Sequence, residues 1–263
     1  MGPGLRVTAL QMAAVPGDVA GNVAAVVELA RVHGPSADLV ITPELVTSGY
    51  DLDLLAAHGL DLAQTADGPA VAAVASAAAD TGATIVLGLL ERDGDTMYDS
   101  AVTITPVGTV TNYRKTHLYP PEEAVFGAGS ALTTVPTPSA VIGPMICFEH
   151  AFPEIAMTVA LAGATVLVIP SAVGDGYDHL LSLRTRARAQ DNQVYAIACN
   201  QSGNGFCGCS LIAGPHGEVI AEAGPEPGVV SAVLDLPAIT TERDHEPALR
   251  LRRPDLYVAD PSP

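Results

Sequence analysis

The chain has 263 residues, of which 48% are hydrophobic and 16% charged, and its formal net charge is −17 at pH 7. This composition is typical of a globular protein with a sizeable core and excludes a disordered chain. The acidic balance argues against nucleic acid and membranes as partners, and no apolar run approaches the length of a membrane span.

No linker of low complexity and no internal repeat interrupts the chain, so we expect a single domain over residues 1–263. The N-terminus lacks a basic start followed by a long apolar stretch, and the four cysteines form no regular framework. Both features favour a cytoplasmic protein.

Strands and helices alternate in the first half of the chain, and strands cluster in the second. Before residue 130, the patterns predict strands at 6–12, 38–42, 84–90, 98–105 and 110–113, helices at 18–33 and 70–80, and loops at 45–59, which resembles a pocket wall, and 119–130. After it, they predict strands at 141–146, 166–170, 194–200, 208–213, 218–223 and 229–234, and helices at 152–162 and 179–192. Two sheets with helices outside them would bury this many apolar strands. The Arg- and Pro-rich tail, 237–263, predicts an arm over the surface or over a partner subunit.

Three polar residues stand where apolar strands end: Glu44 after LVITP, Lys115 after TNYR and Cys147 after VIGPMI. Lys115 is also the only lysine among the 12 formal positive charges, and arginine cannot imitate its compact ammonium. Side chains at strand ends of layered α/β folds gather at one rim and line a pocket. We therefore expect these three side chains to meet.

Together the three residues make chemical sense. A thiol with a pKa near ~8.5 is mostly protonated at neutral pH and needs a base or a cation to become a nucleophile. Glu44 can take the proton, and Lys115 can stabilise both the thiolate and the oxyanion of a tetrahedral intermediate. Taken singly, Glu44 could cap a helix, Lys115 could be a surface charge and Cys147 could be a core residue. Their coincidence at three strand ends favours the catalytic interpretation.

The remaining cysteines do not indicate a metal site. Cys207 and Cys209 alternate along one predicted strand, and their spacing with Cys199 matches no common zinc pattern. We interpret all three as packing residues.

The sequence resembles the nitrilase, or carbon–nitrogen hydrolase, superfamily and its amidase-like branch. The three motifs that carry the resemblance are ITPELVTSGY around Glu44, YRKTHLY around Lys115 and GPMICFEHAFPE around Cys147. Further similar segments are RARAQDNQVYAIACNQSG, SLIAGPHGEVIAEAG and RRPDLY, so that the resemblance covers nearly the whole chain.

The resemblance implies an α/β fold, the four-layer αββα sandwich, usually paired into a homodimer or a larger homo-oligomer. It implies a catalytic cysteine, glutamate and lysine, here Cys147, Glu44 and Lys115, with no metal or organic cofactor. It also implies a second glutamate near the lysine. Glu122 fits the family spacing better than Glu123, which stays the alternative.

Two departures from the family pattern concern the pocket and a helix. Glu149-His150-Ala151 follows Cys147-Phe148 where several relatives carry Asp and Arg, and Asp191 stands where the family usually has Glu. The residues expected to contact substrate are Tyr50, Glu123, Phe148 through its backbone N–H, His150, Ser171 and Ala172.

We expect an amidase that hydrolyses a short aliphatic amide or an N-carbamoyl compound through a thioester. A nitrilase is the alternative, because nitrilases often carry Cys-Trp-Glu where this chain has Cys147-Phe148-Glu149, although the chain contains no tryptophan. An alternative of another class is a catalytically silent, dimeric interaction protein. The expected partner is a small molecule rather than nucleic acid or a membrane.

Overall fold

The computed structural model of the protein describes residues 4–257 and contains two six-stranded sheets. The first has the strand order β14-β1-β2-β3-β4-β5, and the second has the order β13-β12-β9-β8-β7-β6. The first sheet comprises β1 (Leu5–Gln11), β2 (Leu39–Ile41), β3 (Thr84–Asp93), β4 (Thr96–Ile104), β5 (Val110–Arg114) and β14 (Gly228–Leu234). The second comprises β6 (Val135–Pro136), β7 (Val141–Pro144), β8 (Val166–Ser171), β9 (Tyr195–Asn200), β12 (Leu211–Ala213) and β13 (Val219–Glu222).

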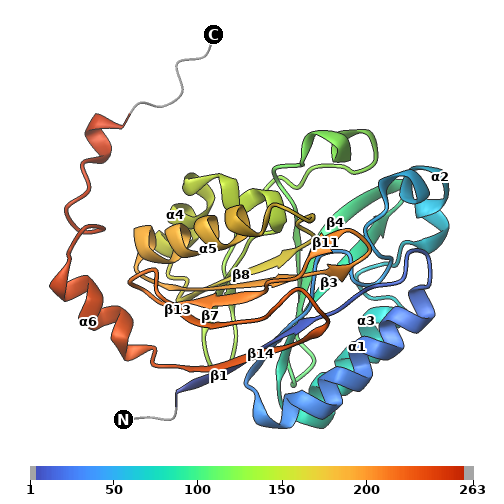
Figure 1. The fold of residues 1–263 in the computed structure, drawn as a ribbon, viewed down its shortest axis with the longest axis horizontal. Coiled ribbons are helices and arrows are strands. Elements are labelled where there is room, and N and C mark those ends of the chain that lie inside the picture. The colour runs from blue at the N-terminus through green and yellow to red at the C-terminus, as the bar shows by residue number, and fades with distance from the viewer. Residues whose placement is uncertain (1–3, 258–263) are drawn as a thin grey trace.

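The two sheets pack face to face, and helices cover their outer faces (Figure 1). Val7 and Ile41 of the first sheet share one buried cluster with Val168 and Ile197 of the second. Helices α1 (Val19–His33) and α3 (Pro69–Thr81) pack on the first sheet, and α4 (Pro153–Leu161) and α5 (Asp178–Asn192) pack on the second. The predicted four-layer αββα sandwich is therefore confirmed.

Local sequence explains where the covering helices begin and end. The Asp18 carboxylate accepts a hydrogen bond from the backbone N–H of Gly21 at the start of α1. Pro69 opens α3, where its missing N–H is not needed, and Gly82 ends it in the left-handed conformation at φ 75°. These boundaries agree with the helices predicted at 18–33 and 70–80.

Two helices lie where none was predicted. The expected loop at 45–59 contains most of α2 (Leu52–Leu62), which Asp51 caps and which buries Leu55. The expected arm contains α6 (Pro237–His245), which buries Ile239 and Glu242. Each helix buries only two residues of its own, Leu55 and Gly59 in α2 and Ile239 and Glu242 in α6, so neither segment has the core-helix character on which the predictions were based. Residues 258–263 of the expected arm lie outside the described residues.

Four short 3-10 segments and one small hairpin complete the described elements. The segments are η1 (Gly34–Ser36), η2 (Pro120–Ala124), η3 (Cys147–Ala151) and η4 (Pro254–Leu256), and the hairpin pairs β10 (Ser202–Gly203) with β11 (Phe206–Cys207). Among residues 4–257, no helix has both the length and the apolar character that crossing a bilayer requires.

Candidate active site

Two of the three side chains predicted to meet at the strand ends, those of Glu44 and Lys115, are in direct contact. Lys115, directly after β5, donates hydrogen bonds from Nζ to Glu44 Oε1 at 2.6 Å and to Glu122 Oε1 at 2.7 Å. It also donates to Asp99 Oδ2 at 3.1 Å, which the sequence analysis did not anticipate. We call these four residues the Lys115 cluster. Their side chains are at most 1% exposed, so water does not screen the charges.

The charge state of Lys115 follows from its partners. Burial alone would favour the neutral amine, but the negative charges of nearby carboxylates, Glu44 first and also Glu122, outweigh it and raise the pKa of Lys115 well above its ordinary value. An ammonium without partners would be intolerable in this interior, and so would a lone carboxylate. The Lys115 ammonium therefore keeps its positive charge, and its three partners hold it at a fixed place.

A close approach between β3 and the loop after β2 fixes the backbone around Glu44. A side chain at Gly88 of β3 would collide with the carbonyl oxygen of Pro43, so only glycine fits there. Leu45, which follows Glu44, has a positive φ of 47°. The side chain of Gln201 donates to the Glu44 carbonyl oxygen at 2.8 Å. Glu44 is thus held from both sheets.

Cys147 is the first residue of η3 and is partly exposed. Its φ is 43°, a left-handed conformation that costs a non-glycine residue on the order of 1–3 kcal/mol. Burial of the thiol and the nearby charge of Glu44 raise the pKa of Cys147 well above its usual value, while Lys115 and the backbone N–H of Ala172 favour the thiolate. The sulfur therefore shares one electrostatic environment with Glu44 and Lys115, in a strained turn.

Glu149 ties this turn to the end of β5. One carboxylate oxygen, Oε2, accepts from the N–H of Ile146 at 2.7 Å. The other, Oε1, accepts from Tyr113 Oη at 2.7 Å and from the hydroxyl and N–H of Thr116 at 2.6 and 2.8 Å. Because Ile146 precedes Cys147 and Thr116 follows Lys115, Glu149 sets the relative position of the two site residues. Glu149 was not predicted from the sequence to make this link.

The structure brings Glu122, and not Glu123, to Lys115. Besides the bond from Lys115, Glu122 accepts from Tyr50 Oη at 2.7 Å and from the N–H of Tyr119 at 2.8 Å. Burial and the charges of Glu44 and Glu122 raise the pKa of Tyr50, so that its hydroxyl remains a donor. Glu123 is exposed on η2.

The other residues expected to contact substrate have different surroundings. The ring of Phe148 is partly exposed and packs against Tyr119, with ring centroids 5.4 Å apart. Ala172 lies at the sulfur through its backbone N–H. Ser171 is fully buried, and its hydroxyl donates to a carbonyl oxygen of its own strand.

His150 lies against α5. Arg184 of that helix donates to His150 Nε2 at 3.2 Å. Burial, together with the charges of Arg184 and Arg188, lowers the pKa of His150 to about 3, so the imidazole is neutral.

Asp99 is the site residue that the sequence analysis missed. It lies in the middle of β4, where residues 99–104 are all buried. A carboxylate in a buried stretch such as DSAVTI requires a buried partner, and this requirement was the available signal. One ligand oxygen each from Glu44, Asp99 and Glu122 lies within 4.8 Å of the others, and the ammonium of Lys115 supplies the cation that they share.

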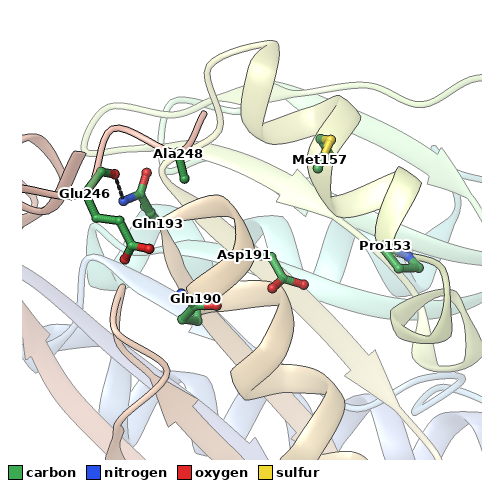
Figure 2. Close-up of a pocket in the computed structure, with 7 residues that line it drawn as sticks. All are labelled: Pro153, Met157, Gln190, Asp191, Gln193, Glu246 and Ala248. Atoms are coloured by element: carbon green, nitrogen blue, oxygen red, sulfur yellow. Dashed lines mark hydrogen bonds between the residues drawn. The ribbon is translucent and has the colours of Figure 1, made fainter. Parts of the chain in front are cut away.

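A separate pocket of about 270 Å³ lies between α4, α5 and the segment that follows α6 (Figure 2). Its lining is Pro153, Met157, Gln190, Asp191, Gln193, Glu246 and Ala248. None of these residues belongs to the Lys115 cluster, so this pocket is distinct from the candidate active site. Asp191, one of the departures from the family, pairs here with Arg188 at 2.9 Å.

The family model of carbon-nitrogen hydrolases matches residues 6–244 of the chain. The chain belongs to the carbon-nitrogen hydrolase family. This match confirms the resemblance inferred from the motifs around Glu44, Lys115 and Cys147.

Three relatives of this carbon-nitrogen hydrolase span nearly the same length. An (R)-stereoselective amidase from Pseudomonas sp. is 31% identical over 95% of this chain and 92% of its own. A nitrilase from Pyrococcus abyssi is 34% identical over 84% of this chain and 86% of its own. The crystal structure of an amidase from Nesterenkonia sp. superposes with a TM-score of 0.85 at 26% identity, covering 97% of this chain and 96% of that one. Family and relatives together support an enzyme that hydrolyses carbon–nitrogen bonds.

Proposed function

We propose that the protein is an amidase that acts on short aliphatic amides or N-carbamoyl compounds through a thioester on Cys147. The observation that carries the proposal is the buried ammonium of Lys115, which Glu44 and Glu122 hold and whose charge acts on the thiol of the strained Cys147. The amidase names of relatives that match nearly the whole chain support the same activity.

The first half of the proposed reaction forms the thioester. Glu44 takes the proton from the Cys147 thiol, and the thiolate attacks the carbonyl carbon of the amide. The oxyanion receives hydrogen bonds from Lys115 and from backbone N–H groups next to the sulfur, those of Phe148 and Ala172. Glu44 then gives its proton to the nitrogen, the C–N bond breaks, and ammonia or an amine leaves.

The second half consumes one water molecule. Glu44 takes a proton from water, which attacks the thioester carbonyl, and the C–S bond breaks. The proton returns to the sulfur and a carboxylic acid leaves, so the sum is amide plus water giving acid plus amine.

A second candidate function is nitrile hydrolysis. The Pyrococcus nitrilase relative supports it, as does Glu149 two residues after the cysteine. The same thiolate would attack the nitrile carbon and form a thioimidate, from which the addition of two water molecules would release ammonia and the acid. The two functions differ in which substrate is turned over.

A substrate panel tests these proposals. Ammonia release is measured with short amides, N-carbamoyl amino acids and nitriles, with Cys147→Ala as the control, and mass spectrometry looks for an acyl adduct on Cys147. We expect release from amides, an adduct of the acyl mass, and background rates in the variant. Release that is insensitive to Cys147→Ala would overturn the cysteine mechanism. Turnover of nitriles alone would select the nitrilase, and no turnover at all would favour the silent scaffold.

A further inference from the structure

We propose that Asp99 is a positioning residue of this site and that it stays protonated. When the oxyanion forms, Lys115 shares with it the hydrogen bond that it otherwise donates to this neutral acid. The inference rests on the proposed function for its catalytic consequence, but the proton itself can be tested without any substrate.

Asp99 holds Lys115 at both ends. Its backbone carbonyl oxygen accepts from the N–H of Lys115 at 2.9 Å, and its side chain accepts from the ammonium at 3.1 Å. Both residues are buried, and the pairing of β4 with β5 begins directly after Asp99, at Ser100. Asp99 therefore fixes both the start and the end of the lysine side chain.

The cluster has more acids than its one cation can neutralise. If Glu44, Asp99 and Glu122 were all ionised, they and Lys115 would carry a charge of −2 in a site that excludes water. The other titratable groups facing it, Tyr50 and Cys147, add no positive charge. Such an uncompensated charge is costly in a protein interior, and the usual remedy is that one acid takes up a proton.

The hydrogen bonds identify which acid takes it. Both oxygens of Glu122 accept from N–H or O–H donors, as an ionised carboxylate requires. Asp99 has the longest of the three contacts with Lys115, and its Oδ1 accepts no hydrogen bond from any residue between 4 and 257. A buried oxygen without a donor is better satisfied as O–H. Glu44 Oε2 also lacks a donor, but a hydrogen bond from Asp99 to the Glu44 carboxylate would keep Glu44 ionised.

The electrostatics act in the same direction. Burial, reinforced by the negative charges of Glu44 and Glu122, raises the pKa of Asp99 well above its usual value in spite of Lys115. With Asp99 neutral, the charge of the cluster falls to −1.

The proton has a consequence for the reaction. An ammonium has three N–H donors, and in the resting site Glu44, Glu122 and Asp99 occupy all three. To hold an oxyanion, Lys115 must share one of these bonds. The bond to a neutral acid at 3.1 Å is weaker than the two bonds to carboxylates at 2.6 and 2.7 Å, so it is the one most easily shared.

The proton is tested by carbon-13 NMR of the intact protein labelled at the aspartate side-chain carboxyls. The Asp99 signal is assigned as the one missing from Asp99→Asn. We expect it to keep the shift of a protonated acid at neutral pH, and a carboxylate shift there would overturn the inference. Because this readout needs no turnover, a failed substrate panel would remove the proposed function and leave the proton in place.

The catalytic role is tested by two substitutions. Asp99→Ala leaves Lys115 displaced, and we expect kcat/KM to fall by about 10²-fold. Asp99→Asn keeps a neutral acceptor for Lys115 and a donor for Glu44, so it should recover most of that loss. Because the amide cannot ionise as Asp99 does, the alkaline limb of the pH–rate profile should also move to higher pH. Equal losses in the two folded variants, or an unmoved alkaline limb, would overturn the role. Thermal unfolding checks that each variant folds. If Asp99→Ala does not fold, the alkaline limb of Asp99→Asn decides the test.

Discussion

Arg114 and Lys115 are adjacent in the chain, yet they serve two opposite kinds of ion cluster. Arg114 is 29% exposed, stacks on the ring of Tyr98 at 3.8 Å and pairs with Glu91 at 2.6 Å. Lys115 is fully buried and pairs with three acids. Arg114 is the last residue of β5, and successive side chains of an extended chain point to opposite faces, so the single step to Lys115 separates the two environments.

The balance of donors and acceptors distinguishes the two clusters. Four hydrogen bonds, from Ser100, Asn112 and two from Arg114, satisfy Glu91, and despite burial these donors lower its pKa. In the Lys115 cluster the acceptors outnumber the donors, and the pKa of Asp99 is raised. A carboxylate with enough donors stabilises the fold as an anion, whereas Asp99, which is short of donors, favours its protonated form.

The largest expected difference is between Glu44→Gln and Glu91→Gln. Removal of the base should lower kcat/KM on the order of 10⁴-fold, because the thiol keeps its proton. The matched variant Glu91→Gln should leave kcat/KM within about twofold but cost about 1–3 kcal/mol of unfolding free energy. Amide hydrolysis and urea unfolding measure the two effects. Similar kinetic losses in both variants would remove the distinction between the clusters.

Exchanging the cations is the next test. Lys115→Arg should lower kcat/KM on the order of 10³-fold, since a planar fork cannot donate to three converging acids and an oxyanion. In Arg114→Lys the bidentate contact with Glu91 is lost, which should cost about 1 kcal/mol of stability while hydrolysis continues. The comparison fails if the arginine variant of Lys115 remains active.

A smaller effect is expected for the hydroxyl that holds Glu122. Tyr50→Phe removes one donor from this carboxylate, and one hydrogen bond to a charged group corresponds to about a tenfold loss of kcat/KM. The loss should fall mainly on kcat, because Glu122 orients Lys115. Tyr98→Phe, whose ring stacks on Arg114, is the matched control and should have no such effect.

The smallest effect concerns how stability depends on pH, and the contributions of Glu91 and Asp99 should change with pH in opposite directions. Glu91 has a lowered pKa, so its contribution is present at neutral pH and is lost as the pH falls through that value. Asp99 has a raised pKa, so the folded state binds a proton that the unfolded chain releases, and its contribution declines as the pH rises above the unfolded value. The Tm deficit of Glu91→Gln should therefore shrink in acid, whereas Asp99→Asn should gain Tm over the wild type between about pH 5 and pH 8. Parallel curves of Tm against pH for Asp99→Asn and the wild type would contradict the raised pKa of Asp99.

The sequence allowed prediction of the strands, the covering helices and the meeting of Glu44 with Lys115, because these depend on local periodicity and on where strands end. The helix at Leu52–Leu62 was not predicted, because Asp53, His58, Gly59 and Asp61 between its leucines favoured a loop. Asp99 was missed because only the paired strand shows that its carboxyl faces Lys115. The left-handed backbone of Cys147 follows from tertiary contacts such as those of Glu149, which no local pattern encodes.

The burial of Lys115 has a consequence for chemical labelling. It is the only lysine of the chain, and in the folded protein it is 1% exposed. A reagent that acylates lysine side chains, or an enzyme that acetylates them, finds no accessible target on the intact molecule. Modification at this position would therefore count the molecules that have opened, and would provide a gauge of local unfolding without any introduced probe.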